Sequence, residues 1–293
     1  MEASKNLYNG ILILSLFALW LALRITDGVE YTISIMLILS IGIGHGANDL
    51  KIYFKKEKLS WRKIISFIAV YALMVASIFC GFFLLPDLML CLFLLASGYH
   101  FGQEHFEKYT LDRSILTYLF EMSYGLSIIL CLLYINSAES LAVINDLIET
   151  EITADWLMIS LIGSTVICLF TGIKTIRSIA GSNILRELLY LLVLFVLFDS
   201  SSLIWGFGIY FVLWHSVPSM YQQIEHLHGA VSLKTLWKYI KNSLLYWLLA
   251  LGFLAALYYV LIDNETLFLT ILVSFLGAIT FPHLLVMHRL YKQ

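Results

Sequence analysis

A histidine and an aspartate four residues apart, His45 and Asp49, stand at the end of a long apolar stretch of the sequence. On a helix, residues i and i+4 lie on the same face, so the two side chains are expected to point at one place. A polar pair in apolar surroundings is costly unless a hydrogen bond or an ion satisfies it. Asp49 is therefore expected to be a partner of the His45 ring or a metal ligand, with helix capping beside Lys51 as the alternative.

Three later apolar stretches also contain one histidine near their end: His100, His215 and His283. All four histidines stand roughly four to seven residues, or about 6–10 Å along a helix, from the polar residues that follow them. Imidazole is a good ligand for iron, copper, nickel and zinc. Four imidazoles at one level predict a shared metal site. The alternative is four separate histidines, each bonded to a neighbouring hydroxyl or carbonyl group.

The residues around these histidines suggest close packing. Gly42 and Gly46 flank His45, and small residues let membrane helices approach one another, which is ordinary packing or room for a ligand. Pro218 follows His215 and is expected to kink its helix. His105 comes five residues after His100 and does not share its helical face, so it is interpreted as a residue of the membrane interface.

The elements that must position these residues are membrane-spanning helices. Of the 293 residues, 60% are hydrophobic and 13% are charged, whereas about a quarter are charged in a typical soluble domain. The composition predicts an all-α, multi-pass bundle of about ten spans in one domain, residues 1–293. The expected spans are 10–26, 31–50, 64–85, 87–103, 114–135, 155–174, 186–199, 203–221, 243–262 and 266–287.

The distribution of basic residues predicts the orientation of this bundle. If the N-terminus is cytoplasmic, every Lys and Arg of the chain except Arg24 falls in or at the edge of an inner segment. This satisfies the positive-inside rule and predicts that both termini are cytoplasmic, with the chain in the cell (inner) membrane. The net charge of -2 says nothing about nucleic acid, but the sequence has no basic patch with interleaved aromatic residues, so no nucleic-acid partner is expected.

The motifs resemble those of the Brp/Blh family of β-carotene 15,15'-dioxygenases, in the same order along nearly the whole chain. The residues that carry the resemblance are His45-Gly46-x-x-Asp49, Tyr99-His100-Phe101-Gly102, His215-Ser216 and Pro282-His283. The resemblance implies a multi-span membrane protein that binds Fe(2+) through histidines and splits β-carotene, or a related carotenoid, with O2 into two molecules of all-trans-retinal. It also implies that His45, His100 and His215 are iron ligands.

The chain departs from the family pattern at two places. Where the pattern HSxxH has its second histidine, this chain has Ser219, and a hydroxyl is a poor iron(II) ligand. His283, Asp49 or water then completes the ligand set, and we include His283 among the expected metal ligands. The acidic position that follows HFG in the family corresponds loosely to the run Gln103-Glu104-His105.

The implied substrate is too apolar to arrive through water, so the carotenoid is expected to enter from the bilayer, where membrane lipids surround the protein. Aromatic side chains near the histidines are candidates for lining its path, with ordinary packing as the alternative. These candidates are Tyr99, Phe101, Tyr210, Phe211, Trp214 and Phe281. A retinal-binding rhodopsin is a candidate downstream partner.

Two functions of other classes also fit four histidines in membrane helices. One is a haem-binding electron carrier with histidine ligands, and the other is a transporter that uses the histidines as a metal or proton relay. The nearly apolar outer halves of the spans argue against a transporter. The sequence has no HExxH motif, no phosphate-binding loop and none of the histidine boxes of membrane desaturases.

Overall fold

A computed structural model describes residues 2–55, 57, 60–109, 111, 114–176, 181–260 and 265–291. Within these ranges every regular element is helical, which confirms the all-α prediction for the described part of the chain. The helices of the first half are α1 (Glu2–Ala22), α2 (Asp27–Leu37), η1 (Ile38–Gly42), η2 (His45–Asn48), α3 (Asp49–Tyr53), α4 (Trp61–Leu84), α5 (Pro86–Glu107) and α6 (Ile115–Ile135). Those of the second half are α7 (Ser137–Leu147), α8 (Ala154–Ile176), α9 (Gly181–Asp199), α10 (Leu203–Ile209), η3 (Tyr210–Ser216), α11 (Val217–His228), α12 (Leu233–Val260) and α13 (Glu265–Tyr291).

Within the described residues, seven helical stretches are long and apolar enough to cross a membrane, so the chain has the features of a membrane protein with several apolar helices. They are Asp27–Tyr53, Trp61–Leu84, Ile115–Ile135, Ala154–Ile173, Leu203–His228, Leu233–Val260 and Leu267–Tyr291. Each of the ten expected spans overlaps a helix, but α1, α5 and α9 are not among the seven, so the count of ten stays a prediction. The sequence missed α7, because its polar and acidic residues resemble a loop.

The orientation also stays a prediction. Several basic residues on which it depends lie outside the described residues, namely Lys56, Lys58, Arg113, Arg177 and Lys292.

Contacts between residues divide the chain into two compact units, each assembled from separate segments. Unit 1 contains Met1–Gly42, Ser97–Leu141 and Ile152–Pro218, and unit 2 contains Ile43–Ala96, Ala142–Glu151 and Ser219–Gln293. The prediction of one domain is not tested by this division. The four histidines are shared equally, with His100 and His215 in unit 1 and His45 and His283 in unit 2.

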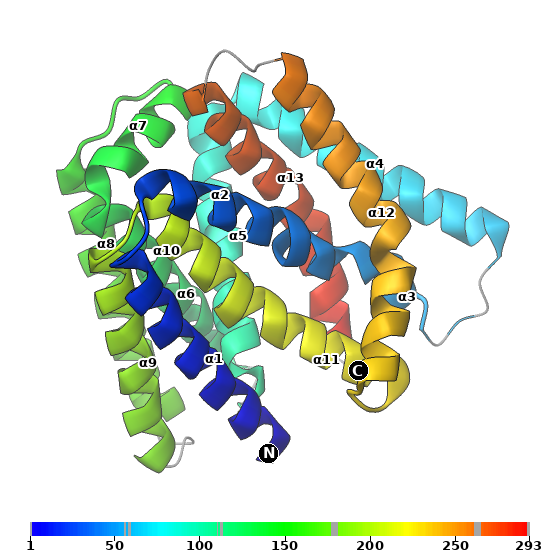
Figure 1. Cartoon of the computed structure of the whole chain (residues 1–293), viewed down its shortest axis with the longest axis horizontal. Helices are drawn as coiled ribbons and strands as arrows, with labels where there is room; N and C mark the ends of the chain where they lie inside the picture. Colours follow the sequence, from blue (N-terminus) through cyan, green and yellow to red (C-terminus); the bar gives the residue numbers. More distant parts are fainter. Residues whose placement is uncertain are drawn as a thin grey trace. The chain divides into compact units, whose positions relative to one another are not determined.

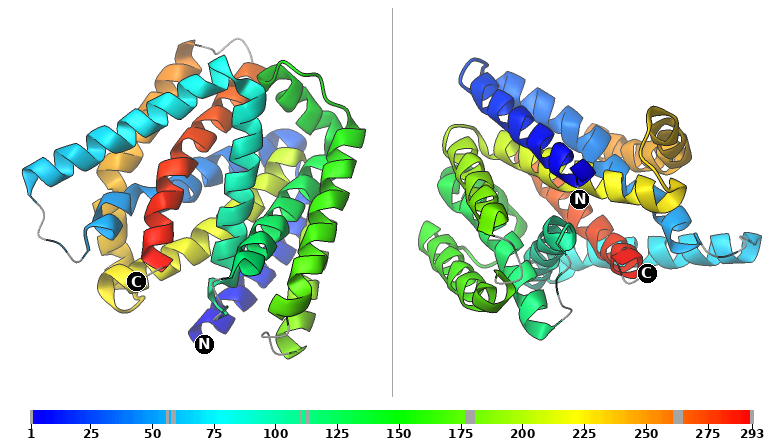
Figure 2. Two further views of the ribbon diagram at one scale, coloured as in Figure 1. Left: turned by 180° about the vertical axis from the view of Figure 1, so that it is seen from behind. Right: turned by 90° about the horizontal axis from the view of Figure 1, so that it is seen from below.

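Unit 1 is built from helices that pack along one another. In Figure 1, α1 lies beside α9 and α10 lies beside α2, and in Figure 2 α6 runs along α8. The second half of α5 approaches α6 closely through glycines. A Cβ atom added to Gly102 would collide with the carbonyl oxygen of Glu121, and one added to Gly125 would collide with that of Gly98. These contacts fix the part of α5 that holds His100.

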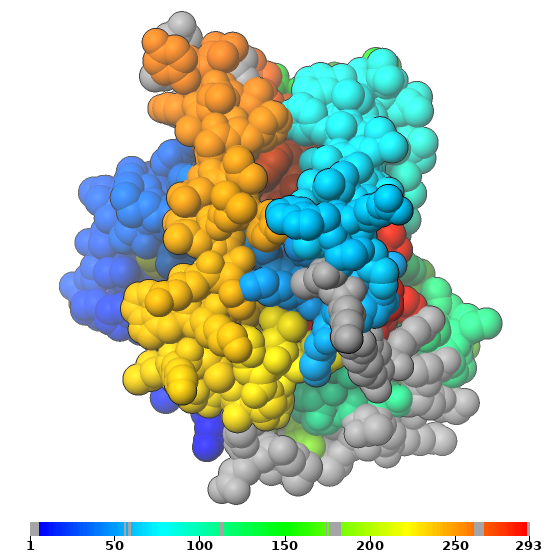
Figure 3. Space-filling model, turned by 90° about the vertical axis from the view of Figure 1, so that its right-hand side faces the viewer, coloured from blue at the N-terminus to red at the C-terminus, as the bar shows by residue number. Residues whose placement is uncertain are grey.

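Unit 2 is organised around α13, which packs against α4 and α3, while α12 packs against η2. Figure 3 shows α12 and α4 on one face of this unit, with part of α13 visible in the hollow between them. The aromatic rings of Phe79 on α4, Phe253 on α12 and Phe275 on α13 follow one another with centroid separations of 6.1 and 5.6 Å. Many apolar side chains of α4 and α12 are exposed, which suits helices that face lipid.

Irregular helical turns occur at or just before two of the four histidines. η1 and η3 are π-helical, and η3 contains His215, whereas η1 ends three residues before His45. Pro218 follows η3 and has no N–H to donate, and the hydroxyl of Ser216 donates a 2.8 Å hydrogen bond to the Phe211 carbonyl. π-Helical turns are rare and are often found at functional sites.

Candidate metal centre

Unit 1 contains a compact group of two histidines and one carboxylate. His100 and Glu104 come from adjacent turns of α5, and His215 comes from η3. One potential ligand atom from each residue lies within 4.8 Å of the other two, and all three side chains are buried. The rings of His100 and His215 meet edge to face with a centroid separation of 4.7 Å. The helical i, i+4 spacing of His100 and Glu104 places them on one face, as the group requires.

Three of the expected aromatic residues gather around His215. The Phe101 ring lies 4.2 Å from the His215 ring, and the Phe211 ring stacks on it at 5.7 Å between centroids. Tyr210 meets Phe101 edge to face at 5.6 Å. These side chains make the surroundings of the histidine apolar, with the phenol of Tyr210 as a polar group.

Two of the other expected aromatic residues, Trp214 and Tyr99, make contacts with neighbouring helices. Trp214 donates a 2.9 Å hydrogen bond from Nε1 to the Ser15 hydroxyl and packs on Tyr190. Tyr99 packs on Tyr118 of α6. Both contacts belong to the packing between helices. Phe281 is half-buried on α13, and its role as a lining residue stays a prediction.

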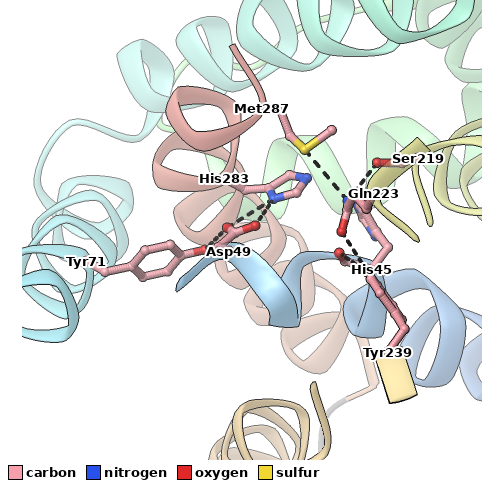
Figure 4. Close-up of polar contacts among 8 residues, drawn as sticks. All are labelled: His45, Asp49, Tyr71, Ser219, Gln223, Tyr239, His283 and Met287. Atoms are coloured by element: carbon pink, nitrogen blue, oxygen red, sulfur yellow. Dashed lines mark hydrogen bonds and ion pairs between the residues drawn. The ribbon is translucent and has the colours of Figure 1, made fainter. Parts of the chain in front are cut away.

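Unit 2 contains a second pair of histidines with a carboxylate (Figure 4). The rings of His45 and His283 stand nearly perpendicular, at 87° and 4.9 Å between centroids. His283 Nδ1 lies 2.8 and 3.1 Å from the two oxygens of Asp49, which also accepts a 3.0 Å hydrogen bond from the Tyr71 hydroxyl. The sequence predicted His45 as the partner of Asp49, and the bond to His283, 234 residues away, was not expected.

Ser219, at the position of the histidine expected from the family pattern, belongs to a hydrogen-bond network in unit 2 (Figure 4). Its hydroxyl accepts a 3.0 Å bond from Gln223 Nε2. The Tyr239 hydroxyl lies 2.7 Å from Gln223 Oε1 and 2.9 Å from the carbonyl oxygen of His45, two acceptors that share its one hydrogen. Asn48 donates to the Tyr239 carbonyl at 3.2 Å. Ser219 is thus linked through hydrogen bonds to the backbone at His45.

His105 is buried among neighbouring helices, and its interpretation as a residue of the membrane interface stays a prediction. Its Nε2 lies 2.5 Å from Glu187 of α9, and Lys108 Nζ lies 2.8 Å from the other oxygen of the same carboxylate. Tyr109 donates a 2.7 Å hydrogen bond to Glu187 as well. The sequence missed this cluster because Glu187 is distant in the chain. These mutual contacts let several ionisable groups lie in a buried place.

The donors in each unit fit a transition metal. Imidazole nitrogens together with carboxylate oxygens bind iron(II) in many oxygenases. A histidine that binds a metal through one ring nitrogen usually donates a hydrogen bond from the other to a carboxylate or a carbonyl group. The contact between His283 Nδ1 and Asp49 has this form. The fold and these buried groups therefore fit a membrane protein whose histidine and carboxylate side chains could hold a metal ion.

The comparisons with known proteins define the family. A family model described as Beta-carotene 15,15'-dioxygenase matches residues 36–291. The chain therefore belongs to the β-carotene 15,15'-dioxygenase family. It is 27% identical over 267 residues to a Beta-carotene 15,15'-dioxygenase from an uncultured marine bacterium, 66A03, with 88% of this chain and 93% of that protein covered. No solved structure matches the chain significantly.

Proposed function

We propose that the protein cleaves β-carotene, or a closely related carotenoid, at the central 15,15' double bond. One C=C bond breaks, and the two atoms of O2 become the aldehyde oxygens of two all-trans-retinal molecules. The observation that supports this most is the family match over residues 36–291, in a chain whose buried histidines stand in the family's motifs. The relative that bears the name of this activity matches along most of the same chain.

We propose Fe(2+) as the cofactor and His45, His100, His215 and His283 as its ligands. The proposal that all four serve one ion comes from the sequence, which puts each of them at a similar distance from the inner boundary of its helix. The burial of each histidine and the presence of a carboxylate in each pair support a metal role. Iron, when bound, would supply the activation of O2, with which a polyene otherwise reacts slowly.

The side chains of the protein itself would orient the histidine ligands and the substrate and would exclude water from them. Asp49 lies at hydrogen-bond distance from His283 Nδ1 and, as the acceptor, would favour the tautomer with its lone pair on Nε2, which is the tautomer that a metal ligand of this kind needs. Ser219, Gln223 and Tyr239 hold the backbone at His45. Phe101 and Phe211 pack on His215 and would place an apolar polyene beside it.

The proposed setting is a bundle of ten spans in the cell membrane with both termini cytoplasmic. In this setting the carotenoid would reach the protein laterally from the lipid, and retinal would be available to a retinal-binding rhodopsin. The aromatic residues Phe101, Tyr210 and Phe211 are the ones we propose for the polyene path.

The test is to express the full chain in bacteria that make β-carotene, with iron and air supplied. The expected result is loss of the orange colour together with the appearance of all-trans-retinal in the extract. Persistence of the colour in cells that contain the folded protein in their membranes would exclude this substrate. An absorption spectrum of the purified protein separates the haem-binding alternative, because bound haem gives a sharp Soret band and a non-haem iron site does not.

A further inference from the structure

Glu104 is a buried carboxylate whose role neither the motifs nor the comparisons assign. It is 1% exposed on α5, one turn after His100. Within the described residues neither of its carboxylate oxygens accepts a hydrogen bond. A carboxylate in such a place is costly unless a cation or a proton compensates its charge.

Asp49 in unit 2 shows how a buried carboxylate of this protein is otherwise satisfied. It is 3% exposed and accepts hydrogen bonds from His283 Nδ1 and from the Tyr71 hydroxyl. Glu30 in unit 1 is also 3% exposed and accepts from the backbone N–H and the hydroxyl of Ser202. Glu104 differs from both, because no such donor serves it in the part of the chain that the structure describes.

The position of Glu104 relative to the two histidines indicates what compensates its charge. Its Oε2 lies 2.6 Å from His215 Nδ1, at ion-pair distance but without the direction of an N–H···O hydrogen bond. One atom each of Glu104, His100 and His215 fall within 4.8 Å of one another. Two ligands bound to one ion at about 2.1 Å lie roughly 3 Å apart when they are at right angles. The 2.6 Å separation is close to this value and the 4.8 Å limit is somewhat wider, so the three donors lie near enough to close around a single ion.

We propose that Glu104 is a metal ligand, which binds the same ion as His100 and His215 and adds a carboxylate to the histidine ligands proposed above. Imidazoles together with a carboxylate are typical ligands in iron(II) oxygenases. Glu104 also supplies a donor in a chain that has Ser219 where the family pattern has a histidine. The inference rests on the proposed function in its choice of iron, and it makes Glu104 a stronger ligand candidate than Asp49.

The experiment compares the same acid-to-amide change at three buried positions in the purified full chain. Metal-free protein is titrated with Co(II), whose visible absorption reports its ligands, and the dissociation constant is measured for Glu104→Gln, Asp49→Asn and Glu30→Gln. Glutamine keeps the size of glutamate and its ability to accept a hydrogen bond, but it is a weak ligand. The affinity of Glu104→Gln is expected to fall by more than about 100-fold, beyond the 10–100-fold typical of groups that only orient a ligand. Glu30→Gln is the matched control and is expected to bind Co(II) as the unaltered chain does.

The losses of Co(II) affinity in Glu104→Gln and Asp49→Asn, compared with each other, show whether Glu104 is a metal ligand. A larger loss in Glu104→Gln than in Asp49→Asn supports the ligand role. An equal or smaller loss overturns it, because Glu104 would then only orient His215.

A second measurement does not depend on the folding of any variant. Infrared difference spectra of the unaltered protein, with and without Zn(II), are expected to show a change in a carboxyl or carboxylate stretching band. The absence of such a change overturns the proposal. Neither measurement reads catalysis, so a chain that binds metal through Glu104 but leaves β-carotene intact would keep this inference and refute the proposed function.

Discussion

The two units use the same three groups, a pair of histidines and one carboxylate, but connect them differently. In unit 2 the carboxylate of Asp49 receives hydrogen bonds from His283 and Tyr71, so its charge is balanced by neutral donors. In unit 1 the carboxylate of Glu104 accepts no hydrogen bond within the described residues and lies against His215 at ion-pair distance. The comparison indicates that hydrogen bonds already satisfy the charge of Asp49, whereas the charge of Glu104, which accepts none among the described residues, is the one that a cation would compensate.

The scaffolds around the two groups differ as well. The unit 1 histidines stand on a helix pressed against its neighbour through Gly102 and on a π-helical turn. In unit 2, a Cβ added to Gly46 would lie 3.6 Å from His283 Nδ1, an ordinary contact distance. Backbone packing therefore fixes the first site, whereas side-chain hydrogen bonds fix the second.

The largest expected effect is the loss of a unit 1 histidine. His100→Ala or His215→Ala should lower metal affinity by more than about 100-fold and abolish cleavage, because each removes a ligand rather than a group that orients one. Metal content after purification and retinal formation in carotenoid-producing cells measure the two effects.

A neighbouring histidine of the same helix provides the control. His105→Ala should keep the metal and instead lower the temperature of unfolding, because it leaves Glu187 with one partner fewer in a buried place. Equal metal loss in His105→Ala and His100→Ala would contradict the assignment of the site.

The next largest effect is a loss of stability, and it is expected to differ between alanine substitutions at Gly102 and at Gly46. Gly102→Ala should destabilise the protein by about 3 kcal/mol, at the upper end of overpacking costs, because the new methyl group meets backbone rather than a movable side chain. Gly46→Ala should change stability by less than about 0.5 kcal/mol, since the methyl group fits. Thermal unfolding in detergent measures both variants. If Gly46→Ala is the more damaging, the view that packing fixes the unit 1 site is mistaken.

Asp49→Asn comes third, with an expected 10–100-fold loss of metal affinity. The amide still fills the space, but it weakens the acceptor for the His283 ring and loses the charge that favours its orientation. Co(II) titration measures the loss, and His283→Ala sets its upper limit. An Asp49→Asn protein with unchanged affinity would show that His283 does not need this carboxylate, and full metal binding in His283→Ala would remove His283 from the ligand set.

The sequence selected four histidines in apolar helices as candidate ligands, and their burial is the part of that selection that the structure shows. Histidines stand out there because ionisable groups are rare in membrane spans, and all four that it selected are buried. The helical class followed from the length of the apolar runs. The sequence analysis did not single out Glu104, although its i, i+4 spacing from His100 is visible in the sequence, and only the structure shows that it lacks hydrogen-bond donors among the described residues.

The sequence did not predict the contacts between segments that are far apart in the chain. Asp49 pairs with His283 rather than only sharing a face with His45, and His105 pairs with Glu187. In both cases a local argument was applied to a charge whose partner lies on another helix. The π-helical turn at His215 was not predicted either, because Pro218 indicates a kink without indicating its form.

The smallest expected effect tests the outermost member of the unit 2 group. Tyr71→Phe removes the hydroxyl that donates to Asp49 at 3.0 Å and leaves the ring in place. A hydrogen bond to a charged group contributes about 1.5–3 kcal/mol. Because Asp49 keeps its hydrogen bond to His283, the free energy of metal binding is expected to change by only part of this amount. We expect roughly a 5-fold loss of Co(II) affinity, about 1 kcal/mol, with little change in the temperature of unfolding. In the Asp49→Asn background the same substitution should have no further effect, because the charge that the hydroxyl stabilises is already gone. An additive loss in the double variant would mean that Tyr71 acts on the site by a route that does not pass through Asp49.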